Sequence, residues 1–171
     1  LDDLLPNVTL VYELYDNKKS AALTSKIAFL MDASVSGDTC ETEQLAFYGK
    51  GAHIVLGTGT SGNSMAMQSV LKYFNAQQGI PQVSGSATSG YLSQKEDYPY
   101  FSRIVPTSKP FAVAMVKFAK YIVGWDAGGI ITGNDGFSLY GGDILQRSAY
   151  EHGLEIKGWE TFQLGTQDMT D

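Results

Sequence analysis

The feature that most constrains this chain is a buried strand that runs into a turn of glycine, threonine and serine, followed by a helix. The strand is predicted at residues 52–56, the turn at 57–62 and the helix at about 63–76. A second strand opens at Pro81 and ends in another turn of small hydroxyl residues at 84–89. This order is typical of one unit of a parallel sheet, because parallel strands need a crossover between them. Ligands bind beyond the carboxyl ends of such strands, where both turns lie.

The rest of the chain alternates strands and helices in the same way, which indicates an α/β protein with parallel sheet. The proline-containing break at 105–110 would let the chain pass from one sheet to another. Residues 34–50 are the least regular and are expected to form a surface insertion. Further strands are expected at 8–14, 100–105, 128–132 and 154–162, and further helices at about 20–33, 109–124 and 139–152.

The helix after the break is expected to be amphipathic. Ser108 is a candidate N-cap, and Pro110 falls in the first helical turn. Apolar residues recur at helical spacing and predict one apolar face, made of Phe111, Ala114, Met115, Phe118 and Ile122.

Composition excludes several classes of partner. The chain has 171 residues, of which 43% are hydrophobic, enough for a sizeable core in one ordinary domain. Its net charge is −6, with 12 Lys and Arg residues and no basic cluster, so a nucleic-acid partner is not expected. No apolar run approaches the ~20 residues that a membrane-spanning helix needs, and no targeting signal opens the sequence.

Cysteine and histidine give little support for catalysis or metal binding. Cys40 is the single cysteine, so it has no disulfide partner within the chain and no Cys/His metal cluster is expected. His53 is expected to be a core residue within the predicted strand, and His152 lies at a helix end, where a cation complements the helix dipole. No acid–base pair lies beside the turns, which argues against an enzyme. Asn7 opens a sequon for N-glycosylation.

The first turn matches the G-x-G-x-x-G pattern of dinucleotide-binding proteins. That class also carries an acidic residue about twenty positions further on, for the ribose. No acidic residue occurs from Asn63 to Lys95, so no nicotinamide or flavin cofactor is expected.

The general chemistry of a helix start remains. Free amides at residues 61–63, with the hydroxyls of Thr60 and Ser61, suit a carboxylate or phosphate. Ser86 and Thr88 supply more hydroxyls at the neighbouring strand end. The alternative is that these side chains merely cap the helix and close the turn. Tyr140, at the start of a later helix, could likewise stack on a ligand or simply pack.

Several stretches together resemble the ligand-binding ectodomains of class C G-protein-coupled receptors. They are residues 57–61, 80–89, 92–93 and 98–106, the last reading YPYFSRIVP. Metabotropic glutamate and GABA-B receptors are the most similar in these sequence motifs, and receptor guanylate cyclases and bacterial leucine-type binding proteins share the fold. The resemblance implies a periplasmic-binding-protein-like clamshell (type I), also called a Venus flytrap, of two α/β lobes. Residues 1–106 would be part of lobe 1, and 107–171 would begin lobe 2.

The resemblance also implies a site. In amino-acid-binding members the ligand α-carboxylate is held by residues that correspond to Ser61 and Thr88, with the backbone around Ser86 contributing. A lobe 2 tyrosine that corresponds to Tyr140 closes over the ligand. The aspartate that helps to hold the amino group in glutamate receptors corresponds to Ser108, which is therefore also a candidate ligand contact. This departure puts a standard α-amino acid in question.

The function implied is a non-catalytic extracellular domain of a membrane receptor, in which lobes close on a small polar, anionic ligand. Dimerisation through lobe 1 follows from the resemblance, as does an intersubunit disulfide at Cys40, although a free thiol or another partner is equally open. Contact with the membrane would come only from segments outside this chain. Two alternatives remain, a soluble solute-binding protein that serves a transporter and a structural module that has lost its ligand.

Overall fold

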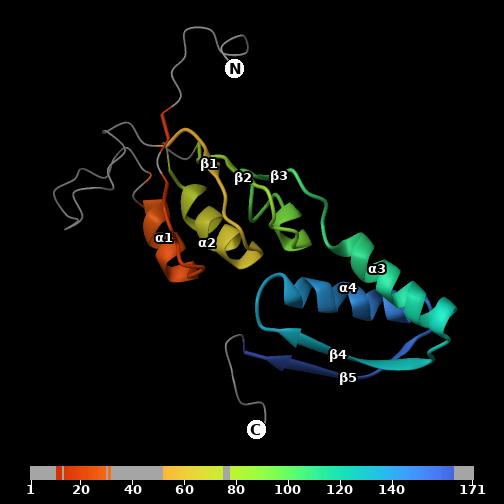
Figure 1. Cartoon of the computed structure of the whole chain (residues 1–171). Coiled ribbons are helices and arrows are strands. Elements are labelled where there is room, and N and C mark those ends of the chain that lie inside the picture. The colour runs from red at the N-terminus through yellow and green to blue at the C-terminus, as the bar shows by residue number, and fades with distance from the viewer. Residues whose placement is uncertain (1–10, 13, 30, 32–51, 75–77, 164–171) are drawn as a thin grey trace.

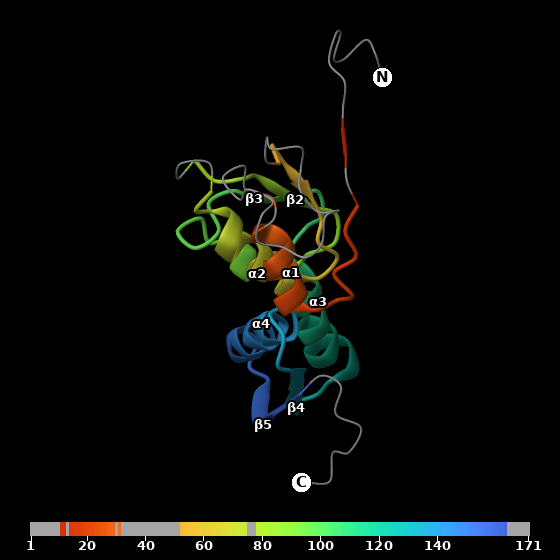
Figure 2. The same cartoon turned by 90° about the vertical axis from the view of Figure 1, so that its left-hand side faces the viewer.

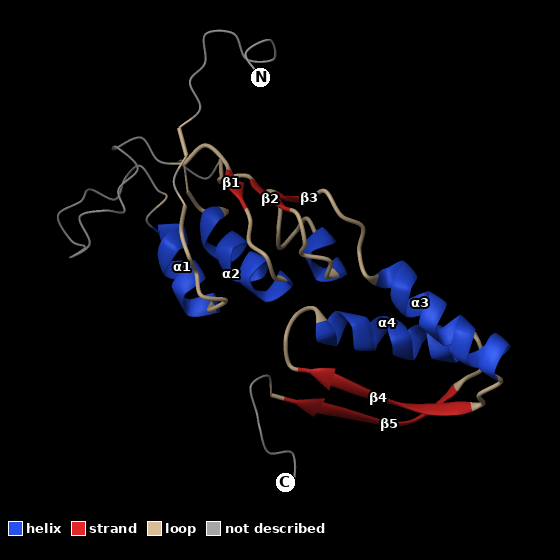
Figure 3. Cartoon of the chain, in the orientation of Figure 1, coloured by secondary structure: helices blue, strands red, loops and turns tan. Residues whose placement is uncertain are grey.

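The described residues form two parallel sheets that share no strand (Figure 1, Figure 3). The computed structural model describes residues 11–12, 14–29, 31, 52–74 and 78–163. Figure 2 shows, in agreement with Figure 1, that helices of both halves lie between the two sheets. No helix in these ranges is long and apolar enough to cross a membrane.

The N-terminal sheet places the two hydroxyl-rich turns next to each other. Its strands are β1 (Val55–Leu56), β2 (Gln82–Ser84) and β3 (Phe101–Arg103), in the order β1-β2-β3 and all parallel. Helices α1 (Ala21–Phe29) and α2 (Ser61–Leu71) lie on one face of it (Figure 1). Because Leu56 pairs with Val83, the chain leaves β1 and β2 at the same edge of the sheet.

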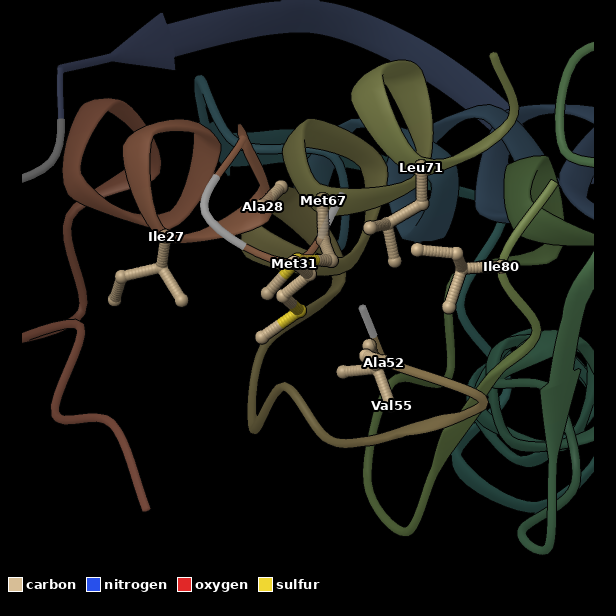
Figure 4. Packing of buried hydrophobic residues seen from close by; sticks show 8 residues of the cluster. All are labelled: Ile27, Ala28, Met31, Ala52, Val55, Met67, Leu71 and Ile80. Atoms are coloured by element: carbon tan, nitrogen blue, oxygen red, sulfur yellow. The ribbon is translucent and has the colours of Figure 1, made fainter. Parts of the chain in front are cut away.

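The core of this half lies between the two helices and β1. Its buried members are Ile27, Ala28, Met31, Ala52, Val55, Met67, Leu71 and Ile80 (Figure 4). The Ile80 amide donates to the Leu71 carbonyl (3.0 Å), which joins the end of α2 to the approach to β2. Gly79 makes the reversal with φ +69°, and a Cβ there would lie 2.1 Å from the Tyr100 ring. Glycine is therefore required at this turn.

The C-terminal sheet pairs β4 (Ala127–Gly133) with β5 (Glu155–Phe162) in parallel. The crossover between them is α4 (Ser138–Glu151). At the start of α4, the Asp135 carboxylate accepts hydrogen bonds from the Phe137 amide (2.8 Å), the Ser138 amide (3.3 Å) and the Ser138 hydroxyl (2.6 Å). Burial alone would raise the pKa of Asp135, but these hydrogen bonds lower it, so the carboxylate stays charged at the positive end of α4.

Helix α3 (Lys109–Lys117) and the π-helical turn η3 (Phe118–Val123) follow the break between the sheets, with Pro110 in the first turn as expected. The predicted apolar face does not point inward in the described structure. Phe111 is 70% and Ile122 73% exposed, and Met115 and Phe118 are exposed as well. The small side chain of Ala112 and that of Val116 are buried instead, because α3 packs closely on α4 through the opposite side.

Two expectations for the first half were also wrong. Of the strand predicted at 8–14, the described residues 11, 12 and 14 lie outside any strand and are exposed, Leu14 at 90%. No strand pairs with them in the described chain, and together with β1 they line an apolar pocket of about 570 Å³. His53 is exposed rather than buried, because the β1 ladder begins only at Val55. Residues 8–10 and 13, Asn7, and the expected insertion with Cys40 lie outside the described residues.

Two adjacent glycines of α4 provide a matched test of this packing. A Cβ at Gly142 would lie 2.6 Å from the Thr132 methyl and 2.7 Å from the Trp159 ring, whereas nothing lies within 4 Å of one at Gly141. We expect Gly142→Ala to lower the free energy of unfolding by about 1–3 kcal/mol through overpacking. Gly141→Ala should raise it by up to about 1 kcal/mol, since alanine favours the helix. Urea denaturation of the full protein measures both, and equal effects would contradict the packing of α4 on β4 and β5.

Candidate ligand-binding site

The turn after β1 and the turn after β2 are joined by hydrogen bonds between side chains and backbone. The Ser84 hydroxyl donates to the Thr58 carbonyl (2.7 Å), and the Ser86 hydroxyl donates to the Gly59 carbonyl (2.9 Å). The structure therefore brings Thr60 and Ser61, in the first turn and the start of α2, beside the second turn.

Ser84 is the central residue of this junction. Its side chain is fully buried at the end of β2, and its oxygen also accepts hydrogen bonds from the amides of Ser86 (3.3 Å) and Ala87 (3.1 Å). Ser84 was not among the site residues predicted from the sequence. The signal was present, because a serine that accepts from amides two and three residues later forms a known turn motif.

Thr60 and Ser61 play different parts. Thr60 is exposed and is the N-cap of α2, where its hydroxyl accepts from the Asn63 amide (3.3 Å). The capping role that the sequence left open therefore applies to Thr60. Ser61 is only 4% exposed, and its oxygen accepts from the Ser89 amide in the second turn (3.1 Å). Because this oxygen is an acceptor there, its own O–H remains able to donate to a further group.

Thr88 has two free donors. It is half-buried, and neither its amide nor its hydroxyl has a hydrogen-bond partner among the described residues. Its carbonyl accepts from the Ser108 amide (2.9 Å) and from the Ser108 hydroxyl (3.4 Å). The expected N-cap hydrogen bond of Ser108 is absent, because this side chain turns to Thr88 and its backbone is already helical. Ser108 thus supports the second turn.

The charge around the turns suits an anion. The first turn of α2 carries no acidic residue, so the positive end of its dipole is not neutralised there. Arg103, at the end of β3, donates to the carbonyls of Ala87 (3.0 Å) and Ser89 (2.7 Å) and to the Ser93 hydroxyl. Burial lowers the pKa of this guanidinium, which still stays charged at neutral pH. Arg103 was not predicted from the sequence, because its role depends on contacts between separate turns.

Tyr140 of α4 approaches the second turn from the other half of the molecule. Its ring meets the Tyr91 ring edge-on, with 5.2 Å between the centroids. It also lies against Gly90, the first residue of the 3₁₀ turn η2 (Gly90–Ser93), where a Cβ would be 2.1 Å from the Tyr140 ring. Burial, with a smaller effect of Asp143, raises the pKa of Tyr91, so its phenol stays neutral at physiological pH. Tyr140 therefore packs against Gly90 and Tyr91, the two residues that follow the second turn.

The described residues contain no group of three or more His, Cys, Asp or Glu side chains that could hold a metal ion. His152 is the C-cap of α4, and its Nδ1 lies 3.2 Å from the Tyr121 hydroxyl. His152 and Tyr121 are both remote in the sequence from the two turns.

Parallel sheets with helices on one face and hydroxyl-rich turns at the strand ends define an α/β ligand-binding domain of the periplasmic-binding-protein type. The chain belongs to the receptor family ligand binding region, whose model matches residues 2–171. This membership confirms the fold class and the resemblance to class C receptor ectodomains.

Similar proteins include the extracellular calcium-sensing receptors of Homo sapiens, Sus scrofa and Mus musculus. Each is 31% identical to this chain over 160 residues, which is 90% of this chain and 14% of the relative. The chain therefore spans about one seventh of the length of these relatives.

The junction between the turns can be tested by Ser84→Ala. This change leaves the Thr58 carbonyl and two amides without their partner, so we expect unfolding to become easier by about 1–3 kcal/mol. Ser69→Ala is the control, because the exposed Ser69 hydroxyl binds only a carbonyl of its own helix, and its loss should cost less than about 0.5 kcal/mol. Chemical denaturation gives both values. A small effect at Ser84 would mean that it does not hold the turns together.

The contact between Gly90 and Tyr140 can be tested by a double-mutant cycle. Gly90→Ala should destabilise the protein by about 1–3 kcal/mol, because the new methyl group overlaps the Tyr140 ring. In a Tyr140→Ala background the same change should cost less than about 0.5 kcal/mol. An undiminished cost in that background would show that the strain at Gly90 has another source.

Proposed function

We propose that this chain is part of the non-catalytic, extracellular ligand-binding region of a membrane receptor, and that its two hydroxyl-rich turns bind a small anionic ligand. Family membership supports the receptor assignment. The observation that carries the ligand class is Thr88, whose amide and hydroxyl have no partner in the described structure. Donors of this kind beside a helix start suit a carboxylate.

The hydrogen-bonding groups divide into two sets under this proposal. The Thr88 amide and hydroxyl and the Ser61 hydroxyl would donate to the carboxylate, with exposed Thr60 and Ser86 at its edge. Each hydrogen bond to a charged group contributes roughly 1.5–3 kcal/mol. Ser84 and Ser108 would hold the turn without touching the ligand.

We further propose that residues 1–106 belong to one lobe and 107–171 to a second. The separate sheets on either side of Ser108 support this division. Tyr140 would be the group of the second lobe that responds to ligand, because it already contacts Gly90 and Tyr91 beside the second turn. Ligand binding would then shift an equilibrium between open and closed arrangements of the lobes.

A soluble transport protein and a ligand-free module remain the competing functions. The similarity to membrane receptors favours the first proposal over a transport protein. Thr88 supports it over a ligand-free module, because its amide and hydroxyl are left available to a ligand beside the start of α2. Dimerisation through the first lobe, an intersubunit disulfide at Cys40 and glycosylation at Asn7 are further proposals that follow from the resemblance.

The test is isothermal titration calorimetry of the complete extracellular domain with a panel of amino acids, small carboxylates and Ca²⁺. The cation is included because the relatives are named for calcium sensing. We expect a carboxylate to bind, and expect Ser61→Ala and Thr88→Ala each to weaken it by about 1–3 kcal/mol.

Ser102→Ala is the control, because Ser102 is an exposed residue of β3 outside the turns. Its binding should match that of the unmodified domain. If no panel member binds, or if binding is indifferent to Ser61 and Thr88, the carboxylate proposal is wrong and a structural module becomes the better interpretation.

A further inference from the structure

Arg103 is tied to the backbone on both sides of Thr88. One of its terminal nitrogens, Nη1, donates to the carbonyls of Ala87 (3.0 Å) and Ser89 (2.7 Å), and Nη2 donates to the Ser93 hydroxyl. Its guanidinium also lies over the Phe101 ring, 5.4 Å from the centroid. All of these acceptors are neutral.

This charge has no acidic partner in the described part of the chain. The ion pairs found there are Lys120 with Asp126, Arg147 with Asp143, and Lys157 with Glu155. Removing a cation from water without a counter-ion costs free energy, which neutral hydrogen bonds offset only in part. A partly buried, unpaired guanidinium beside an anion-binding turn is therefore a feature that a bound anion would compensate.

The geometry of the peptide bond links Arg103 to the donor on Thr88. The Ala87 carbonyl and the Thr88 amide belong to one planar peptide unit, in which C=O and N–H point in opposite directions. When Arg103 holds the carbonyl on its own side, the Thr88 N–H must point away from Arg103. The next peptide unit is held independently, because the Thr88 carbonyl accepts from Ser108 and the Ser89 amide donates to Ser61.

We propose that Arg103 is a positioning residue for the ligand site, which fixes the 87–88 peptide so that the Thr88 amide faces the anion, and whose charge the anion compensates. This inference rests on the proposed function. It assigns two separable properties to one side chain. The forked guanidinium fixes the peptide, and the positive charge favours an anionic ligand over a neutral one.

The experiment uses the complete extracellular domain with Arg103→Lys, Arg103→Met and the control Ser93→Ala. The probes are L-glutamate and L-phenylalanine, each as the free acid and as the α-carboxamide, measured by calorimetry. Arg103→Met should weaken binding of the acid by about thirtyfold or more and that of the amide by about threefold, since only the acid gains from the charge.

Arg103→Lys keeps the charge but cannot hold two carbonyls in a planar fork, so it should weaken acid binding by about tenfold and retain a preference for acid over amide. Ser93→Ala removes one contact of Arg103 outside the Thr88 peptides and should stay within about twofold of the unmodified domain. Equal weakening of acid and amide by Arg103→Met, or no weakening, would overturn the inference.

A second measurement needs no ligand. The amides of Ala87 and Ser89 are bound by the hydroxyls of Ser84 and Ser61, and in Arg103→Met their hydrogen exchange should accelerate about tenfold while that of α4 and β4 stays unchanged. Unchanged exchange at these amides would overturn the positioning role even if a probe binds. If no probe binds but exchange accelerates locally, the carboxylate proposal fails and the positioning of the turn by Arg103 is upheld.

Discussion

The candidate site depends on how backbone polar groups are satisfied where β1 and β2 end. Beyond the last ladder position, the carbonyls and amides of both turns lose their strand partners and must find others. Three hydroxyls supply several of these partners, beside those that Arg103 and Ser108 supply. Ser84 binds Thr58 and two amides of its own turn, Ser86 binds Gly59, and Ser61 binds the Ser89 amide. The turns are therefore held by short side chains that occupy little space, and this leaves Thr88 with its donors free.

The second half of the molecule approaches these turns at Gly90. Gly90 follows the second turn directly, and its missing side chain gives the Tyr140 ring room to pack beside Tyr91. Tyr91, which contacts Tyr140, would thus be only a few residues along the chain from the turn that holds the ligand. That proximity gives a physical route by which occupancy of the turns could alter how the two sheets pack.

Local patterns in the sequence predicted most of the elements, because turns and helix ends have distinct residue requirements. The helix after Gly57–Thr60 and the strands at 82–84 and 101–103 lie where glycine, proline and β-branched residues predicted them. The predictions were wrong where the structure of a segment depends on what packs against it. The apolar stripe of α3 was identified correctly as a stripe, but the direction it faces is decided by α4. Residues 11, 12 and 14 belong to a segment of strand composition, yet a strand forms only beside a neighbour.

The site shows the same division. The places of Thr60, Ser61 and Thr88 in the two turns could be predicted because these turns follow strands, whereas the contacts of Arg103 and Gly90 join segments that no local pattern specifies. The resemblance to class C receptor ectodomains supplied what local chemistry could not, namely which hydroxyls to group together. Ser84 lies between these cases, because its turn motif is local but only its burial reveals its importance.

Some residues of the candidate site are buried and others are exposed, and this difference affects which substitutions the site can accept during evolution. Ser84 and Ser61 are buried and bonded, so a change at either disturbs the backbone itself. Thr60 and Ser86 are exposed, and Gly85 has open space where a side chain would go. Substitutions at these edge positions can accumulate without unfolding the turns. A gene lineage could therefore pass from one ligand to another through single, folded intermediates, with the buried serines inherited unchanged.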